Sequence, residues 1–317
     1  YLVQSLLQNG KGTIYVLVRK ASKDKFDALL AQMGFDPKRV VAVYGDLGKP
    51  RLGLSPTQVK QLAGKVKHLF HLAAIYDLTA DEESQIRANV DGTKHAMQLG
   101  VAVKAGCFHH VSSIAAAGLY PGVFKEDMFD EAEGLDDPYF RTKHDSEGMV
   151  RREYPRPYRI YRPAIVLGHS QTGEIDKIDG PYYFFRLIKR MRALLPQWVP
   201  TIGIEGSRLN MVPVDYVADA MDWIAHKPGL DGHCFHLTDP APQRVGEALN
   251  TFARAANAPQ MTMRVDARMF AFVPPMVRGA IFNLPPVKRF TNMMLRDLGI
   301  PRQVLKYLKY PPRFVSR

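Results

Sequence analysis

A tyrosine and a lysine stand four positions apart in the segment YFRTK, as Tyr139 and Lys143. On a helix these two positions share one face, so a phenol and an ammonium group would point toward one site. A carbonyl that accepts a hydride develops negative charge on its oxygen and needs a proton donor. Tyr139 becomes such a donor near neutral pH if the charge of Lys143 stabilises the phenolate. The pair therefore predicts carbonyl reduction.

Two serines precede this pair in the chain, at the end of the apolar run CFHHV. The second, Ser113, can hydrogen-bond the same carbonyl oxygen and fix its position. A Tyr and a Lys at this spacing also occur by chance on solvated helices, where they form an ordinary i,i+4 pair. Four further motifs at regular intervals argue against that alternative: GDL at 45–47, HLAA at 71–74, NVDGT at 89–93 and YRPAIVLG at 161–168.

The elements that must position these residues alternate along the chain. Runs rich in Val, Ile, Phe and Tyr are expected to be strands, at 13–18, 40–44, 68–73, 107–112, 159–166 and 234–237. Amphipathic segments between them are expected to be helices, at 23–33, 56–62, 82–99, 138–153, 181–194, 216–225 and 245–255. This alternation is typical of α/β proteins. It predicts a Rossmann-like, doubly wound parallel sheet with helices on both faces.

The composition divides the chain into two regions. We expect residues 1–168 to form the nucleotide-binding domain, because the motifs above lie there. From about Gly168 the content of Pro and aromatic residues rises, and three Pro-Pro pairs occur within 273–312. Such punctuation breaks regular elements. Residues 169–317 are therefore expected to be mainly a smaller substrate-binding subdomain and cap, with strands that return to the sheet.

The first twelve residues, YLVQSLLQNGKG, are expected to form a helix that ends at Gly10 or Gly12. A nucleotide-binding domain of this type opens with a strand and a glycine-rich turn before that helix. No G-x-x-G-x-x-G motif stands near the start. We expect that about a dozen residues carrying the first strand and the glycine loop precede Tyr1. The alternative is a domain that lacks this loop and binds its cofactor poorly.

Basic residues follow the first apolar run of the chain. Arg19 and Lys20 come directly after TIYVLV, and Lys23 and Lys25 are close behind. Domains selective for NAD place an acidic residue here to bind the ribose diol, whereas an Arg suits the 2'-phosphate of NADP. We therefore expect NADPH as the cofactor. The alternative interpretation is a solvated basic loop.

With these motifs in place, the sequence resembles the extended short-chain dehydrogenase/reductase family over essentially the whole chain, apart from the absent glycine loop. The resemblance implies that Ser113, Tyr139 and Lys143 form the catalytic triad. It also implies that Asn89 is a structural residue that holds backbone.

The resemblance further implies a set of cofactor contacts. They comprise an Asp-Leu pair at the adenine, two alanines that flank the cofactor and a segment that covers the nicotinamide, together with the basic pair and the catalytic Tyr and Lys. The residues are Arg19, Lys20, Asp46, Leu47, Ala73, Ala74, Tyr139, Lys143, Pro163 and Ile165.

Longer runs resemble one branch of this family. HHVSSIAAAGLYPGVFKEDMFDEAE and YRIYRPAIVLGHSQTGEIDKIDGPYYFF are similar to the N-terminal reductase half of bacterial alcohol-forming fatty acyl-CoA reductases. The resemblance implies NADPH-dependent reduction of long-chain fatty aldehyde, fatty acyl-CoA thioester or both, and a second reductase domain that follows. Two alternatives stay open: a sugar-nucleotide epimerase or dehydratase of the same superfamily, and a non-catalytic NADP-binding regulator.

The formal charge of +12 indicates an anionic partner, such as NADPH, coenzyme A, lipid or nucleic acid. Nucleic acid is not expected, because Lys and Arg are spread along the chain and no zinc-finger or RRM signature occurs. A metal site is not expected either. His233 and His236 flank Cys234, but strand alternation sends the two histidines to opposite faces.

Cysteine use and hydropathy indicate a cytoplasmic protein. Cys107 and Cys234 each lie in a strand-like apolar run, where buried thiols occur more often than disulfides. No segment reaches the about 18 uninterrupted apolar residues of a membrane span, and the N-terminus lacks the features of a signal peptide. Peripheral membrane contact through apolar and basic residues at 270–289 is an open alternative to a domain-closing helix pair.

Overall fold

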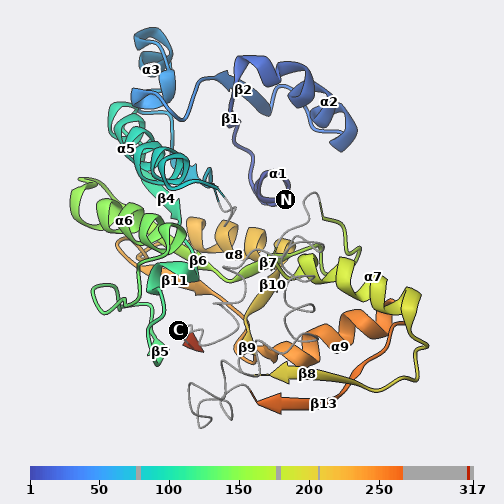
Figure 1. Ribbon diagram of the computed structural model, residues 1–317. Helices are drawn as coiled ribbons and strands as arrows, with labels where there is room; N and C mark the ends of the chain where they lie inside the picture. The colour runs from blue at the N-terminus through green and yellow to red at the C-terminus, as the bar shows by residue number, and fades with distance from the viewer. Residues whose placement is uncertain (76–79, 176–179, 206–207, 267–312, 315–317) are drawn as a thin grey trace.

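A computed structural model describes residues 1–75, 80–175, 180–205, 208–266 and 313–314 (Figure 1). The three Pro-Pro pairs, at 274–275, 285–286 and 311–312, and the apolar, basic segment 270–289 lie outside these residues.

A four-stranded parallel sheet forms the centre of the molecule, in the order β11-β6-β4-β3. Its strands are β3 (His68–His71), β4 (Cys107–Val111), β6 (Tyr158–Pro163) and β11 (Cys234–Leu237). Phe108 and Ile160 in the two middle strands are fully buried. Because all four strands run the same way, the segments that follow them meet at one edge, where ligands bind in open α/β sheets.

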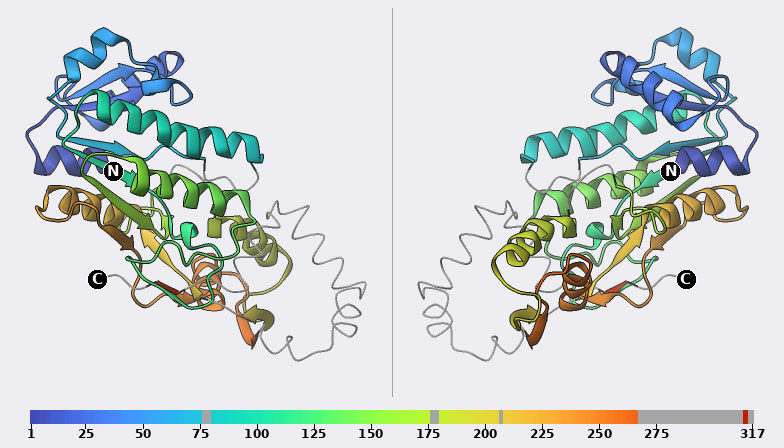
Figure 2. Two further views of the ribbon diagram at one scale, coloured as in Figure 1. Left: turned by 90° about the vertical axis from the view of Figure 1, so that its left-hand side faces the viewer. Right: turned by 90° about the vertical axis from the view of Figure 1, so that its right-hand side faces the viewer.

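Helices cover both faces of this sheet. On one face lie α5 (Gly92–Ala102) and α6 (Pro138–Glu153), which contact each other. On the other lie α1 (Leu2–Asn9) and α8 (Val214–His226), also in contact (Figures 1 and 2). This three-layer arrangement confirms the expected Rossmann-like α/β fold.

Strands β1 (Ile14–Val18) and β2 (Val40–Tyr44) form a separate two-stranded parallel sheet, accompanied by α2 (Lys23–Met33) and α3 (Pro56–Leu62). A close contact joins this unit to α5. A Cβ added to Gly92 would lie 2.9 Å from Leu47 Cγ, so the approach of the Leu47 side chain to the helix requires glycine there.

The C-terminal half contributes a second core. Its helices are α7 (Phe184–Leu194) and α9 (Val245–Ala255), which pack beside the parallel strands β8 (Thr201–Glu205) and β13 (Met261–Asp266). Phe184, Leu187 and Leu249 are buried in this core. Short strand pairs complete the fold: β7 (Ile165–Leu167) with β10 (Met211–Pro213), β9 (Arg208–Leu209) with β12 (Gln243–Arg244), and β5 (Val123–Phe124) with β14 (Arg313–Phe314).

The strand expected at 68–73 ends at His71 and the helix expected at 216–225 spans Val214–His226, and three further elements are divided or begin differently in the structure. The helix expected at 82–99 is divided into α4 (Glu82–Gln85), a π-helical turn (Ile86–Asp91) and α5. The strand expected at 159–166 is interrupted at Ala164, because β6 pairs with β4 and β11 whereas β7 pairs with β10. The helix expected at 181–194 begins as a 3-10 turn, Gly180–Tyr183, before α7. The division at residue 168 stays a prediction. Within the described segments, no helix is both long and apolar enough to cross a membrane.

Candidate active site

Tyr139 and Lys143 lie in the first two turns of α6. The helix begins there because the Asp137 carboxylate accepts a hydrogen bond from the Tyr139 backbone N–H at 3.0 Å, and Pro138 occupies the first helical position. Tyr139 is half-buried, whereas Lys143 is only 5% exposed. The phenol therefore lies nearer to solvent than the ammonium group.

The Lys143 ammonium group is held against the central sheet. Its Nζ donates a hydrogen bond to the carbonyl oxygen of Val111 in β4 at 3.4 Å. Burial lowers the pKa of Lys143 to about 8, against the opposing effect of the negative charge on Glu147. At neutral pH the group is still a cation, as stabilisation of a phenolate requires.

Ser113 caps the short 3-10 helix Ile114–Ala117 that follows β4. Its Oγ accepts the Ala115 N–H at 3.1 Å, so the hydroxyl proton stays available to a substrate oxygen. Helix α6 packs against this short helix. The structure thus brings the segment of Ser113 together with the helix that carries Tyr139 and Lys143.

His144 directly follows Lys143 on α6. Its Nδ1 is 3.0 Å from the Ala116 carbonyl oxygen, and its ring stacks on Phe129 with centroids 4.1 Å apart. Because a carbonyl oxygen only accepts, Nδ1 is the donor. His144 therefore helps to fasten α6 to the segment after Ser113.

Asn89 holds backbone, as the sequence predicts. Its Oδ1 accepts the Ile75 N–H at 2.7 Å, and its Nδ2 donates to the Ile75 carbonyl oxygen at 3.0 Å. The amide therefore fixes the loop that contains Ala73 and Ala74, directly after β3. Ala73 is exposed and Ala74 is half-buried at this edge of the sheet.

Pro163 and Ile165 lie at the same edge. Pro163 ends β6 opposite Leu237, and Ile165 begins β7. The backbone N–H of Ser112 donates to the Tyr161 carbonyl oxygen at 2.8 Å. This bond places the segments that lead to Ser113 and to Pro163 side by side.

The remaining predicted residues lie on the two-stranded sheet. Arg19 and Lys20 are exposed directly after β1. Asp46 and Leu47 follow β2, where Asp46 Oδ1 accepts the Gly48 N–H at 2.9 Å. Because β1 and β2 are parallel, the structure groups these four residues at one end. They stand apart from the sheet that carries Ser113.

The structure contains a buried ion pair next to the candidate site that the sequence analysis does not predict. The side chains of Glu147 on α6 and Arg162 on β6 are both fully buried. Arg162 Nη2 lies 2.7 Å from Glu147 Oε1 and Nε lies 3.0 Å from Oε2, so the contact is bidentate. The sequence offers one sign of this pair. Arg162 is a charged residue within an apolar strand, and Glu147 follows Lys143 by one turn on α6.

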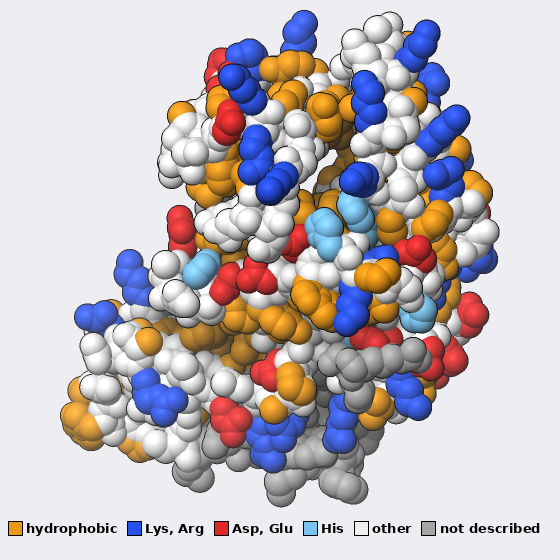
Figure 3. All heavy atoms as spheres, turned by 180° about the vertical axis from the view of Figure 1, so that it is seen from behind, with side chains coloured by type: hydrophobic (Ala, Val, Ile, Leu, Met, Phe, Trp, Pro, Cys, Tyr) orange, Lys and Arg blue, Asp and Glu red, His pale blue; other side chains and the backbone are white. Residues whose placement is uncertain are grey.

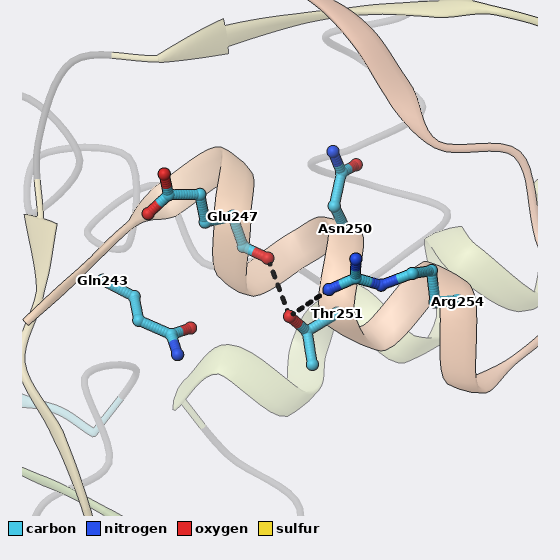
Figure 4. Close-up of a pocket in the computed structure, with 5 residues that line it drawn as sticks. All are labelled: Gln243, Glu247, Asn250, Thr251 and Arg254. Atoms are coloured by element: carbon cyan, nitrogen blue, oxygen red, sulfur yellow. Dashed lines mark hydrogen bonds between the residues drawn. The ribbon is translucent and has the colours of Figure 1, made fainter.

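A polar hollow of about 330 Å³ lies elsewhere, on the surface of α9 (Figure 4). It is lined by Gln243, Glu247, Asn250, Thr251 and Arg254. Thr251 Oγ1 donates to the Glu247 carbonyl oxygen at 3.0 Å and accepts from Arg254 Nη2 at 3.3 Å. None of the residues predicted to act in chemistry lines this hollow.

Comparison with known proteins identifies the family. Residues 1–221 match the model of an NAD-binding family described as "Male sterility protein". The chain belongs to this family. It is an NAD(P)-binding oxidoreductase domain of the extended short-chain dehydrogenase/reductase type, as the motifs around Tyr139 and Lys143 predict.

Curated relatives include large synthetases. The chain is 30% identical over 256 residues to the non-canonical nonribosomal peptide synthetase FrzA of Cladobotryum sp. This match covers 76% of the present chain and 24% of FrzA. It is also 28% identical over 213 residues to the aldehyde reductase lnbA of Aspergillus flavus, and this match covers 64% of the present chain and 20% of lnbA. The chain spans less than a quarter of the length of these curated relatives.

Among solved structures, the terminal R domain from the myxalamid PKS-NRPS biosynthetic pathway is similar over the whole chain. The TM-score is 0.74 and the sequence identity 25%, and the match covers 100% of this chain and 78% of that domain. The similarity supports a reductase-type domain.

Proposed function

We propose that this domain reduces the carbonyl group of a long-chain fatty aldehyde, a fatty acyl-CoA thioester or both, with NADPH as the cofactor. The observation that carries the proposal is the buried Lys143 ammonium group, one turn from Tyr139 on a capped helix that packs against the segment of Ser113.

The described residues fit a dinucleotide that crosses the edge of the sheet. Arg19 and Lys20 are exposed at one end, where a 2'-phosphate would meet them. At the other end, the exposed Ala73 and the half-buried Ala74 follow β3, and Pro163 ends β6, two strands away in the same sheet. When bound, NADPH supplies the hydride that adds to the carbonyl carbon.

Each catalytic side chain then has a separate task. Ser113 donates a hydrogen bond to the carbonyl oxygen and fixes its position. Tyr139 donates the proton that this oxygen needs as it gains charge. Lys143 stabilises the phenolate that remains and is placed to bind the ribose of the nicotinamide. An aldehyde requires one such cycle, whereas a thioester releases its thiol and requires two.

The choice of NADPH over NADH rests on charge. Including Arg19 and Lys20, the chain has 43 Lys and Arg against 31 Asp and Glu. In the view from behind, Lys and Arg outnumber Asp and Glu over the upper part of the molecule, which contains β1, β2 and their helices (Figure 3). An excess of positive charge favours the additional phosphate of NADPH.

The choice of substrate rests on the resemblance to alcohol-forming fatty acyl-CoA reductases and on the aldehyde reductase among the relatives. A second reductase domain in the full-length protein stays a prediction from that resemblance. Peripheral contact with a membrane is likewise a proposal.

The test uses the full-length protein with NADPH and three substrates: a long-chain aldehyde, the matching acyl-CoA and a UDP-sugar. We expect NADPH consumption and fatty alcohol with the aldehyde or the acyl-CoA, and a much lower rate in the Tyr139→Phe variant. If neither carbonyl substrate consumes NADPH, the proposed activity is wrong. Conversion of the UDP-sugar without net consumption would identify the epimerase alternative.

A further inference from the structure

The carboxylate of Glu147 lies where three segments of the candidate site meet. It accepts hydrogen bonds from Ser112 Oγ at 2.7 Å and from Arg162 Nε at 3.0 Å on one oxygen. The other oxygen accepts from Arg162 Nη2 at 2.7 Å and from Arg151 Nε at 2.9 Å. Four donors on a fully buried carboxylate leave it little freedom to move.

The partners of this carboxylate adjoin the residues of the proposed chemistry. Ser112 directly precedes Ser113, and Arg162 directly precedes Pro163. Glu147 itself stands one turn after Lys143 on α6. One side chain therefore links the segment that orients the carbonyl, the helix of the proton donor and the segment expected to cover the nicotinamide.

We propose that Glu147, clamped by Arg162, is the positioning residue of this active site: it sets the three segments relative to one another and places a fixed negative charge one turn from Lys143. The inference rests on the carbonyl reduction proposed above and adds a residue that touches neither substrate nor cofactor.

The environment of Lys143 shows why this charge matters. His71 on β3 and His110 on β4 also face the ammonium group, and burial, followed by nearby positive charge, lowers the pKa of both imidazoles. Both rings are therefore neutral at physiological pH. Glu82, on the neighbouring α4, is paired with Arg141 at the surface. Among the described residues, Glu147 supplies the negative charge that raises the pKa of Lys143.

Arg162 is itself fixed on every side. Its Nη2 also donates to the Met128 carbonyl oxygen at 2.9 Å, its Nη1 lies 3.2 Å from His236 Nε2, and the guanidinium carbon is 5.1 Å from the centre of the Phe124 ring. Burial opposes ionisation of Glu147, but the charge and hydrogen bonds of Arg162 outweigh it and hold the pKa of Glu147 at about 2. The carboxylate therefore stays negative throughout the pH range of catalysis.

Glu147→Gln tests the charge while keeping the size of the side chain. Loss of the negative charge should move the titration midpoint of Lys143 below its value of about 8. The alkaline decline of kcat/KM should follow it to lower pH, with a loss on the order of tenfold near the original midpoint. Glu147→Asp, which keeps the charge on a shorter side chain, should lower kcat with little change in the pH profile.

Glu147→Gln also leaves Arg162 buried without its counter-charge, which can destabilise the fold. The double variant Glu147→Gln/Arg162→Met removes both charges, and it should melt closer to the wild-type temperature while still showing the shifted pH profile. Glu82→Gln is the matched control, because it breaks a carboxylate–arginine pair between α4 and α6 at the surface. It should leave the profile unchanged.

NMR titration of lysine-labelled full-length protein gives a readout that does not depend on activity, with the Lys143 signal assigned by its loss in Lys143→Met. A lower Lys143 midpoint in Glu147→Gln and in the double variant supports the proposal. An unchanged midpoint in both overturns it, even if activity falls. If the midpoint moves but the wild-type protein reduces neither carbonyl substrate, Glu147 keeps its electrostatic role and the proposed reductase function is wrong.

Discussion

The side-chain amide of Asn89 donates a hydrogen bond to Oγ1 of Thr142 at 3.1 Å, and Thr142 directly precedes Lys143. The same amide is bonded to both backbone groups of Ile75. Asn89 therefore joins the loop after β3 to helix α6 through one planar group. Its residence in a π-helical turn agrees with the frequent occurrence of such turns at functional sites.

Asn89→Ala should lower the free energy of unfolding by about 2 to 4 kcal/mol, because it removes three hydrogen bonds and leaves buried polar groups behind. Chemical denaturation measures the change. Gln98→Ala, which removes one long bond to the Arg51 N–H at the surface, serves as the control and should cost less than about 0.5 kcal/mol. A loss of that same small size for Asn89→Ala would mean that the amide does not tie these segments together.

Tyr139→Phe should lower turnover of the carbonyl substrate by a factor on the order of 100 to 10,000, because the ring stays and only the proton donor is lost. The affinity for NADPH, measured by calorimetry, should change little. Rates near those of the wild-type protein, with any other reductase domain in the full-length protein inactivated, would exclude Tyr139 as the donor.

Arg19→Ala should weaken the binding of NADPH and leave that of NADH nearly unchanged, because only NADPH carries the 2'-phosphate. Lys60→Ala removes the same charge from the exposed surface of α3 and is the matched control. Equal losses for both cofactors in Arg19→Ala would assign Arg19 a structural role instead.

Lys143→Met should abolish reduction and make the protein more stable at neutral pH. Burial holds the pKa of Lys143 at about 8 in the folded state, below its ordinary value of 10.5, so folding penalises the charged form. That penalty is complete below about pH 8 and amounts to about 3 kcal/mol. This penalty disappears as the pH rises from about 8 toward 10.5. Over that range the free energy of unfolding of the wild-type protein should therefore increase.

Urea denaturation of the wild type and of Lys143→Met at several pH values measures the difference. The advantage of Lys143→Met should be largest near neutrality and should shrink above about pH 8. A variant that is less stable than the wild type at neutral pH would show that the contacts of Lys143 with Val111 and Glu147 outweigh the cost of its burial.

Local signals in the sequence were sufficient for several elements. The bounds expected for α2, α3, α6 and α9 are those of the structure. Each of these helices has a marked start or end. Ser55 forms a capping box with Gln58 before α3, and Gly34, in the left-handed region, ends α2.

Elements that depend on distant contacts could not be predicted in this way. The π-helical turn at Ile86–Asp91 accompanies the bonds of Asn89 to Ile75 and Thr142, which no local pattern contains. The break at Ala164 arises because β7 pairs with a strand some fifty residues further along the chain.

The candidate site shows the same limit. The spacing of Tyr139 and Lys143 is local and predicts that they share a helix face, whereas no local spacing predicts that Glu147 and Arg162 meet. Charged side chains are usually exposed, so their spacing on a helix and in a strand carries no sign that they meet in the interior. Glu147 and Arg162 form a buried pair only because α6 packs next to β4 and β6 in the folded protein.

The pairing of β14 with β5 has a consequence for synthesis of the protein. Phe314 of β14 packs edge-on against Phe124 and against His236, the two rings that flank the Arg162 guanidinium. Val123 and Phe124 leave the ribosome long before Arg313 and Phe314, by tens of seconds at a rate of about 5 to 20 residues per second. During that interval the Phe314 ring is absent from its place against Phe124 and His236. The nascent chain therefore completes α6 early and the packing around the partner of Glu147 late.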